Sequence, residues 1–391
     1  MNQENKGKEI VEKKEVNPLP SKNNDDMRKK LMKMMLVIGG GLILLLIIIF
    51  VISIVLGSKS KSYEEVEQIM KNAAIKYYGV QSGLLPKEGE VVSVKVDTLV
   101  SDEYMKSLTK LRKNESCTGR VEVSRVNKKL VYTPYLDCGK KYVTKELYKA
   151  ILEQKTVTSG SGLYDISGEK VYRGENINNF VKLDNNLFRV VKVTSDNKIM
   201  LILSDVVSSY GYYYDDRYNA TKLFNSGFND YRISRMYTTL NTTIYKGNKD
   251  FTLLSSNDKS KLSKFNLCIG KRSNKDTSLD NSTECSDVLE NQIIGLLTVS
   301  DYMRASLDSN CKVATDKTCQ NYNYLKVTSG DWWLVTGNSD NNYQAYAVQS
   351  SGYISSFNAS SSKKVRPVIV LNNNVMIKSG NGSLDKPFKL K

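Results

Sequence analysis

The chain has 391 residues, of which 40% are hydrophobic and 25% charged, so it is long enough for two or three domains and too apolar to be disordered throughout. Its 57 Lys and Arg residues outnumber its 41 Asp and Glu residues, which gives a net charge of +16. It contains no histidine. This excludes nucleophilic sites that use histidine as the base and zinc sites with histidine ligands.

The strongest local signal is an uncharged, Leu- and Ile-rich run from Met34 to Leu56. A helix of this length spans roughly 34 Å, enough to cross a hydrocarbon core of about 30 Å. The run is too long for a cleavable signal peptide and lacks small residues at its end. We therefore predict a transmembrane helix at 34–56, preceded by a disordered tail at 1–33.

The charges around this run predict its orientation. Four Lys and Arg residues lie at 28–33 and only two at 59–61, so the tail at 1–33 is expected in the cytoplasm. All six cysteines follow the run, which favours disulfides in an oxidising space. We therefore expect a single-pass cell-membrane protein whose C-terminal part is extracellular.

The first segment after the run, 62–155, is predicted to be a small α+β domain. Apolar residues recur at helical spacing from Tyr63 to Tyr77. A strand at Val91–Val96 and a second helix at about Ser101–Leu111 are expected to follow.

Two alternating runs in this segment, 120–126 and 129–135, predict a β-hairpin with Asn127-Lys128 as its loop. In that register Cys117 lies directly opposite Cys138, as a cross-strand disulfide requires. The residues expected on the disulfide's face are Val121, Val123, Leu130, Tyr132 and Leu136.

A helix that rises from a membrane span into a small sheet resembles the architecture of type IV pilin-like subunits. The processing signal of that family includes a Glu near the fifth apolar position, and Gly39–Leu56 contains no Glu. The resemblance is therefore one of architecture alone.

The remaining segment, 163–391, is predicted to be β-rich α+β and to follow a Gly/Ser linker at 158–162. The expected strands are 180–183, 187–193, 199–203, 332–335, 343–348 and 365–371. The expected helices are 233–240, 257–262 and 299–307.

A series of short motifs runs through this segment in order: YRGEN at 172–176, NFVKL at 179–183, FRVV at 188–191, DRYN at 216–219, NDY at 229–231, IGLLTVSDY at 294–302, WWL at 332–334, VRPV at 365–368 and KSGNGSLDKPF at 378–388. The series resembles a lectin-like domain of unknown function from surface proteins of low-GC Gram-positive bacteria, over about 165–391. That family is similar in core layout to C-type-lectin-like and formylglycine-generating-enzyme domains. The resemblance implies an irregular scaffold whose loops display a binding surface. The sugar-binding motifs of calcium-dependent lectins are absent.

The tyrosine run at 210–214 suggests a recognition surface, because Tyr gives rigid, amphipathic contact area. The expected ligand-binding residues are Tyr212, Tyr213, Tyr214, Arg217, Trp333, Asn341 and Tyr343. Arg366 is expected to anchor a buried hydrogen-bond network. We predict no catalytic residues, no cofactor and no metal site; Asp215-Asp216 as a carboxylate pair and 339–342 as a calcium loop are minor alternatives.

The four distal cysteines lie beside polar segments that offer little to bury. Local pairing, Cys268 with Cys285 and Cys311 with Cys319, ties each segment into a rigid loop that is a plausible part of the binding face. Spacing leaves the other two pairings open.

Together these features predict a non-enzymatic, membrane-anchored recognition or adhesion protein. Its expected partners are the membrane and an anionic wall polymer, a glycan or a surface protein, because the segment after the membrane run is basic. Nucleic acid is not expected, since no basic-aromatic binding motif occurs. The alternatives are a pilin-like envelope-assembly subunit and a wall-modifying enzyme that uses carboxylates.

Overall fold

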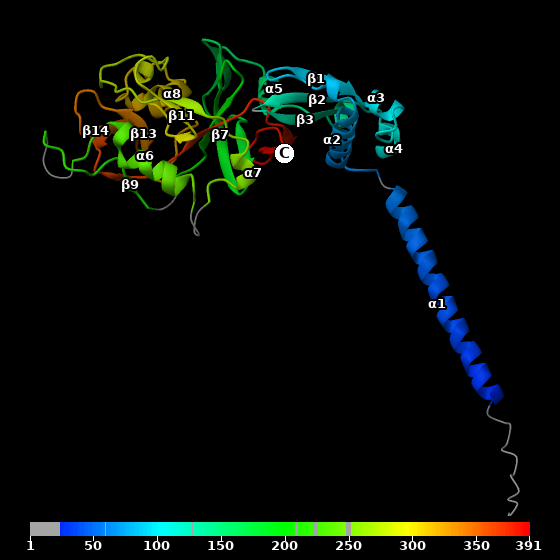
Figure 1. Cartoon of the computed structure of the whole chain (residues 1–391). Coiled ribbons are helices and arrows are strands. Elements are labelled where there is room, and N and C mark those ends of the chain that lie inside the picture. The colour runs from blue at the N-terminus through cyan, green and yellow to red at the C-terminus, as the bar shows by residue number, and fades with distance from the viewer. Residues whose placement is uncertain (1–23, 59, 127, 208–209, 222–225, 248–251) are drawn as a thin grey trace, which may run out of the picture.

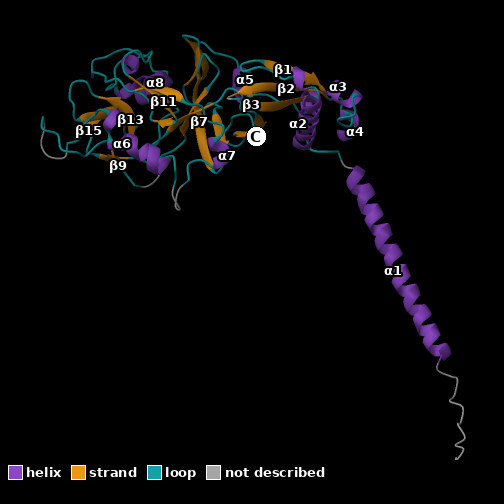
Figure 2. Ribbon diagram, in the orientation of Figure 1, coloured by secondary structure: helices purple, strands orange, loops and turns teal. Residues whose placement is uncertain are grey.

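The computed structural model describes residues 24–391 except 59, 127, 208–209, 222–225 and 248–251. A long N-terminal helix leads into a small module, residues 60–143, which lies beside a large module, residues 147–391 (Figure 1). Each module has its own buried hydrophobic core. Strands form the body of both modules (Figure 2), so the α+β class is confirmed.

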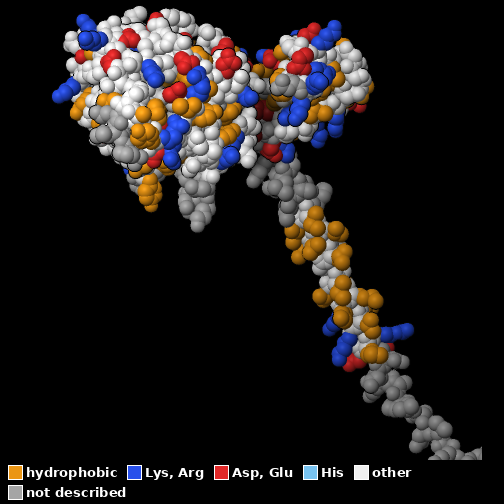
Figure 3. All heavy atoms as spheres, turned by 60° about the vertical axis from the view of Figure 1, so that its left-hand side comes forward, with side chains coloured by type: hydrophobic (Ala, Val, Ile, Leu, Met, Phe, Trp, Pro, Cys, Tyr) orange, Lys and Arg blue, Asp and Glu red, His pale blue; other side chains and the backbone are white. Residues whose placement is uncertain are grey.

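The N-terminal helix, α1, extends over Asn24–Ser58. In the described part of the chain it is the one helix long and apolar enough to cross a membrane. Hydrophobic side chains cover much of it, and Lys and Arg gather near its N-terminal end (Figure 3).

The predicted disordered tail is wrong for residues 24–33, which belong to α1; residues 1–23 lie outside the described part. Met, Lys, Arg and Leu are good helix formers, and Asp25 and Asp26 stand in the first turn, where negative charge favours a helix. These residues form no apolar stripe, so the hydrophobic pattern did not predict that the helix extends over them.

The small module packs one helix against a three-stranded antiparallel sheet of order β1-β2-β3. The helix α2 begins with a capping box, in which Ser62 and Glu65 each accept a hydrogen bond from the other's main chain. The elements of these two layers are α2 (Tyr63–Val80), β1 (Val91–Lys95), β2 (Thr118–Val126) and β3 (Lys129–Asp137).

The hairpin β2–β3 confirms the predicted register: Thr118 pairs with Asp137, and Val126 with Lys129. The Cys117–Cys138 disulfide closes it as expected. Of the predicted loop, Lys128 has a φ of 65°, while Asn127 lies outside the described residues. The predicted core face is buried or packs against the buried residues of the small module.

The second helix predicted for this module is wrong. The chain forms two short helices instead, α3 (Val96–Ser101) and α4 (Leu108–Leu111). Glu103 has a φ of 61° and the amides of Tyr104 and Met105 both donate to the carbonyl oxygen of Leu99, which ends the first helix. The apolar residues at helical spacing therefore belong to two short helices joined by a bend, and not to one helix.

The large module is built on a twisted sheet of order β12-β17-β8-β7-β6-β19-β18, with the β4–β5 hairpin attached to β7. All pairs are antiparallel except β19 with β6. The strands are β4 (Gly162–Ile166), β5 (Glu169–Arg173), β6 (Phe180–Leu183), β7 (Asn186–Val193), β8 (Ile199–Leu203), β12 (Ile294–Gly295), β17 (Val368–Leu371), β18 (Ile377–Ser379) and β19 (Phe388–Leu390).

A second sheet, β13-β14-β15, and two short strand pairs, β10–β11 and β9–β16, complete the module. Their bounds are β9 (Tyr212–Tyr213), β10 (Phe265–Cys268), β11 (Val288–Gln292), β13 (Trp332–Gly337), β14 (Gln344–Val348), β15 (Ile354–Asn358) and β16 (Ser362–Lys363). The helices are short: α5 (Leu147–Leu152), α6 (Arg235–Thr239), α7 (Ser256–Lys259) and α8 (Val299–Ala305). Each predicted strand and helix of this segment overlaps an observed one; the bounds of β6 and β8 match the prediction, and the others differ at one or both ends.

The Gly/Ser stretch predicted to link the domains lies within the large module. Leu147 and Ile151 of α5, which precede the stretch, are buried in the large core. The amide of Val157 donates to the carbonyl oxygen of Leu163, so the stretch is a turn that leads into β4. The change from one core to the other therefore lies at 144–146. The prediction failed because Gly and Ser mark tight turns as readily as linkers.

The modules are joined a second time by the C-terminal segment that contains β18 and β19. Lys391 Nζ lies 2.6 Å from both carboxylate oxygens of Glu67, a buried residue of α2. Lys378 forms an ion pair with Glu64 of the same helix. The amide of Leu147 donates to the carbonyl oxygen of Val375, so the covalent connection and the returning segment are also hydrogen-bonded to each other.

Candidate functional site

The structure brings the predicted ligand-binding residues together around β9 and the loop between β13 and β14. Two of them form part of the core. Tyr214 and Trp333 are fully buried, and their rings meet edge to face at 5.5 Å. Trp333 Nε1 donates to the carbonyl oxygen of Tyr212, and the Tyr214 hydroxyl to that of Val335. These two side chains therefore support the surface and offer no exposed ring.

The other predicted residues lie nearer the surface. Tyr213 is 47% exposed, while Tyr212, Arg217, Asn341 and Tyr343 are partly buried. The Asn229 amide lies within hydrogen-bonding distance of the carbonyl oxygens of Asn338, Asn341 and Gln344 and holds the loop in place. The loop is therefore fixed, and a ligand role for its side chains stays a prediction.

The acidic residues considered in this region have protein partners. The Asp215 carboxylate accepts bonds from Arg217 and from the amide of Phe228, whereas Asp216 pairs with Arg235. The two acids thus face different partners rather than one reacting centre. In the loop at 339–342, Asp340 accepts hydrogen bonds from Ser273 Oγ and the amide of Asn274.

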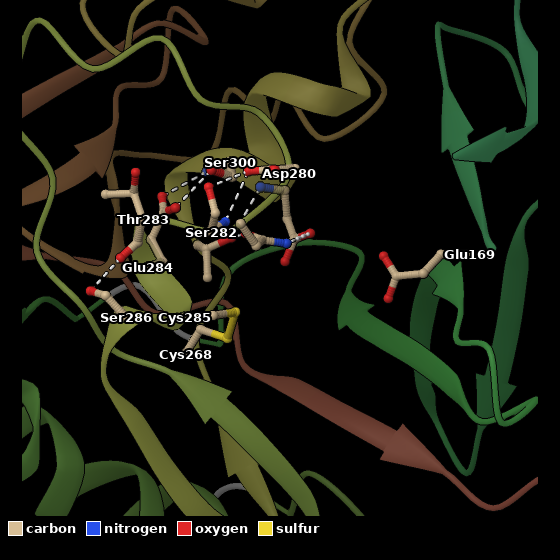
Figure 4. The surroundings of a disulfide bond; sticks show 12 residues. Glu169, Cys268, Asp280, Ser282, Thr283, Glu284, Cys285, Ser286 and Ser300 are labelled. Atoms are coloured by element: carbon tan, nitrogen blue, oxygen red, sulfur yellow. Dashed lines mark hydrogen bonds between the residues drawn. A yellow bond between two sulfur atoms is a disulfide. The ribbon is translucent and has the colours of Figure 1, made fainter. Parts of the chain in front are cut away.

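A different site lies beside the Cys268–Cys285 disulfide. A pocket of about 380 Å³ separates this disulfide and Asp280 from Glu169 on β5, which faces them from the other side (Figure 4). The other residues that line it come from β7, β8, β10, α8 and the loops next to them. Ser167, Ser195, Asn266 and Asp280 are exposed.

Four charged side chains form the base of this pocket. Lys192 Nζ lies 3.0 Å from Glu169 Oε1 and 3.7 Å from Asp301 Oδ1. Arg304 contacts the same two acids through its two terminal nitrogens. The set has two positive and two negative charges, so each ion is neutralised inside the protein.

Polar residues extend the network. Asn281 Nδ2 donates to Asp301 Oδ1 at 2.9 Å, and Thr298 Oγ1 donates to Asn281 Oδ1 at 2.7 Å. Burial alone would raise the pKa of Asp301, but the charges of Lys192 and Arg304 and the bond from Asn281 outweigh it, so that pKa lies well below its ordinary value. Asp301 is therefore held as a carboxylate.

The disulfide loop that forms one wall is held rigidly. The Glu284 carboxylate accepts hydrogen bonds from the amide and the hydroxyl of Ser300 on α8. Arg272, fully buried, contacts Glu284 and donates to the carbonyl oxygens of Asp276 and Ser278. A wall fixed in this way preserves the spacing of the polar groups, which reduces the entropy lost when a ligand binds.

Within the described residues, only Glu115, Cys117 and Cys138 gather with the spacing of a metal site. The two cysteines are joined in a disulfide and provide no thiolate. Arg366 is fully buried and donates to three carbonyl oxygens, as the sequence predicted.

Sequence reasoning missed Glu169, Lys192, Asp301 and Arg304 as a group, because folding alone brings together residues so far apart in the chain. The available signal was the cysteine pairing, which pointed to the loop at 268–285. The sequence matches no protein-family model, no curated protein and no solved structure.

Proposed function

We propose that the protein is a single-pass, membrane-anchored recognition protein that binds a glycan through its lectin-like large module outside the cell. The observation that carries the proposal is the pocket beside the Cys268–Cys285 disulfide. Its base presents charged donors and acceptors at fixed positions, and Phe265 and Met200 provide apolar surface. Fixed polar groups combined with apolar surface suit a sugar, whose hydroxyls both donate and accept.

The anchor and the location rest on two other observations. The helix α1 has the length and composition of a membrane span, and all three disulfides follow it. Disulfides are typical of oxidising compartments. External protease on intact cells should therefore digest the region after α1, whereas full protection of that region would contradict the proposed orientation.

Three carboxylates line the pocket, which raises the alternative of a wall-modifying enzyme. A general acid needs a raised pKa to hold its proton. The charges of Lys192 and Arg304 instead lower the pKa of Asp301 despite its burial, and bonds from Ser282 lower that of Asp280. Glu169 is ion-paired with both cations. The arrangement therefore favours binding over acid-base catalysis.

The test is an array of glycans and wall polymers probed with the full chain in detergent. Ser195→Trp, at an exposed position on the pocket, should abolish the selective signal while leaving the unfolding temperature unchanged. Ser256→Trp, on exposed α7 away from the pocket, is the matched control and should bind normally. Equal binding by both variants would show that this pocket is not the site, and release of sugar fragments would favour the enzyme.

A further inference from the structure

A second pocket, of about 560 Å³, lies along β6 and β7 and is lined by Arg189, Phe180, Tyr324, Lys326 and Leu384 among others. It shares no lining residue with the pocket beside the Cys268–Cys285 disulfide. The Arg189 guanidinium lies between two aromatic rings, 4.1 Å from the ring centre of Phe180 and 4.8 Å from that of Tyr324. Stacking of this kind fixes the plane of the guanidinium.

Arg189 is a partly buried cation that has no acidic partner among the described residues. In the described part of the chain, no Asp or Glu oxygen lies within 4.0 Å of its nitrogens. Its Nε donates to Asn179 Oδ1 at 2.9 Å, and its two terminal nitrogens reach the carbonyl oxygens of Tyr324 and Ile177 only at 3.4 Å. Burial lowers the pKa of Arg189 to about 10. The protein therefore provides few short polar contacts that stabilise this charge.

The Arg189 guanidinium has N–H groups that no described acceptor engages. It carries five N–H groups, and the described acceptors engage three of them, two at long distance. Arg189 is partly exposed and lines the pocket. Lys326 adds a second positive charge and Glu175 one negative charge, so the pocket has a net charge of about +1.

We propose that this pocket binds a carboxylate group of an anionic ligand. A planar carboxylate can pair with two N–H groups of a fixed guanidinium, and its single charge matches that of the pocket. The exposed Leu384 beside it offers apolar contact to the rest of the ligand. The site does not depend on the glycan pocket.

The probe is glucuronate, with glucose as the uncharged ring of the same size, titrated by calorimetry into the full chain in detergent. Glucuronate should bind saturably, and its affinity should fall as the salt concentration rises. Glucose should bind at least tenfold more weakly. Arg189→Gln should reduce glucuronate affinity at least tenfold and Lys326→Met a few-fold.

Because Arg189 packs between two rings, its replacement could impair folding, so an exposed position provides a second test. Leu384→Trp should block the pocket and abolish glucuronate binding without lowering the unfolding temperature, whereas Leu384→Ala should retain binding. Ser195→Trp, which closes the other pocket, should also leave glucuronate binding unchanged. Equal binding of glucose and glucuronate, no saturable glucuronate binding, or unchanged binding by a folded Arg189→Gln would overturn the proposal.

Discussion

Arg366 shows how one side chain can organise a core when no acidic group of the described residues pairs with it. Its guanidinium lies 4.6 Å from the ring centre of Trp332 and donates to the carbonyl oxygens of Leu203, Ser204 and Leu325. Arg366→Met should leave these three oxygens unsatisfied and lower the free energy of unfolding by roughly 3–5 kcal/mol. Urea denaturation measures the loss. Arg232→Met, at an exposed ion pair with Asp287, is the matched control and should change stability by under about 0.5 kcal/mol.

Asp301 should make stability depend on pH. Burial opposes its charge, but Lys192 and Arg304 overcome this and hold its folded pKa below the unfolded value of about 3.9. Its stabilising contribution is thus fully present above the unfolded pKa and is lost as pH falls through the lower folded pKa. In Asp301→Asn the free energy of unfolding should fall less steeply between about pH 5 and pH 2.5 than in the parent chain. Denaturant titrations at each pH measure this. The same slope in Asp301→Asn as in the parent chain would contradict this assignment.

At the scale of elements, the hairpin β2–β3 has one buried and one exposed face. Val123 is fully buried, whereas Val131 on the opposite face is 37% exposed. Val123→Ala should cost roughly 2 kcal/mol, because it leaves a cavity in the small core. Val131→Ala should cost under about 1 kcal/mol. Thermal unfolding of both variants tests the register, and equal losses would argue against it.

The Cys117–Cys138 disulfide joins the ends of this hairpin. Replacing both cysteines by Ser should lower the free energy of unfolding by about 3 kcal/mol, since the open form gains chain entropy. Reduction of this disulfide should destabilise the parent chain. The double variant, which lacks the pair, should lose no stability through it. Peptide mapping without reductant should show Cys117 joined to Cys138 alone, and any other partner would contradict the pairing.

The sequence predicted those elements whose pattern is set locally. Alternation and cysteine spacing were enough for β2–β3, and short apolar runs were enough for β6 and β8. Local pattern failed where a bend preserved helical spacing, as after Leu99, and where a turn resembled a linker, as at 158–162. The pocket beside Cys268–Cys285 depends on long-range pairing, because Glu169 and Arg304 are brought together by the sheet and α8.

At the scale of the whole molecule, Lys391 connects the large module to α2. Glu67 is buried, with Lys391, Tyr142 and Thr144 as its donors. Lys391→Met should leave this carboxylate without its cation, cost about 3 kcal/mol and speed hydrogen exchange in α2. Lys389→Met, at an exposed position on β19, is the control. Unchanged exchange in α2 of Lys391→Met would show that the pair does not hold the modules together.

This second connection also affects how the molecule carries mechanical load. A single covalent link at 144–146 would act as a swivel, and tension on the large module would first reorient it. Here the link is hydrogen-bonded to the segment that returns to α2, so rotation must break Lys391–Glu67 and Lys378–Glu64 as well. Force applied to the large module would therefore reach α2 through two parallel paths, and the ion pairs would break before the backbone is stretched.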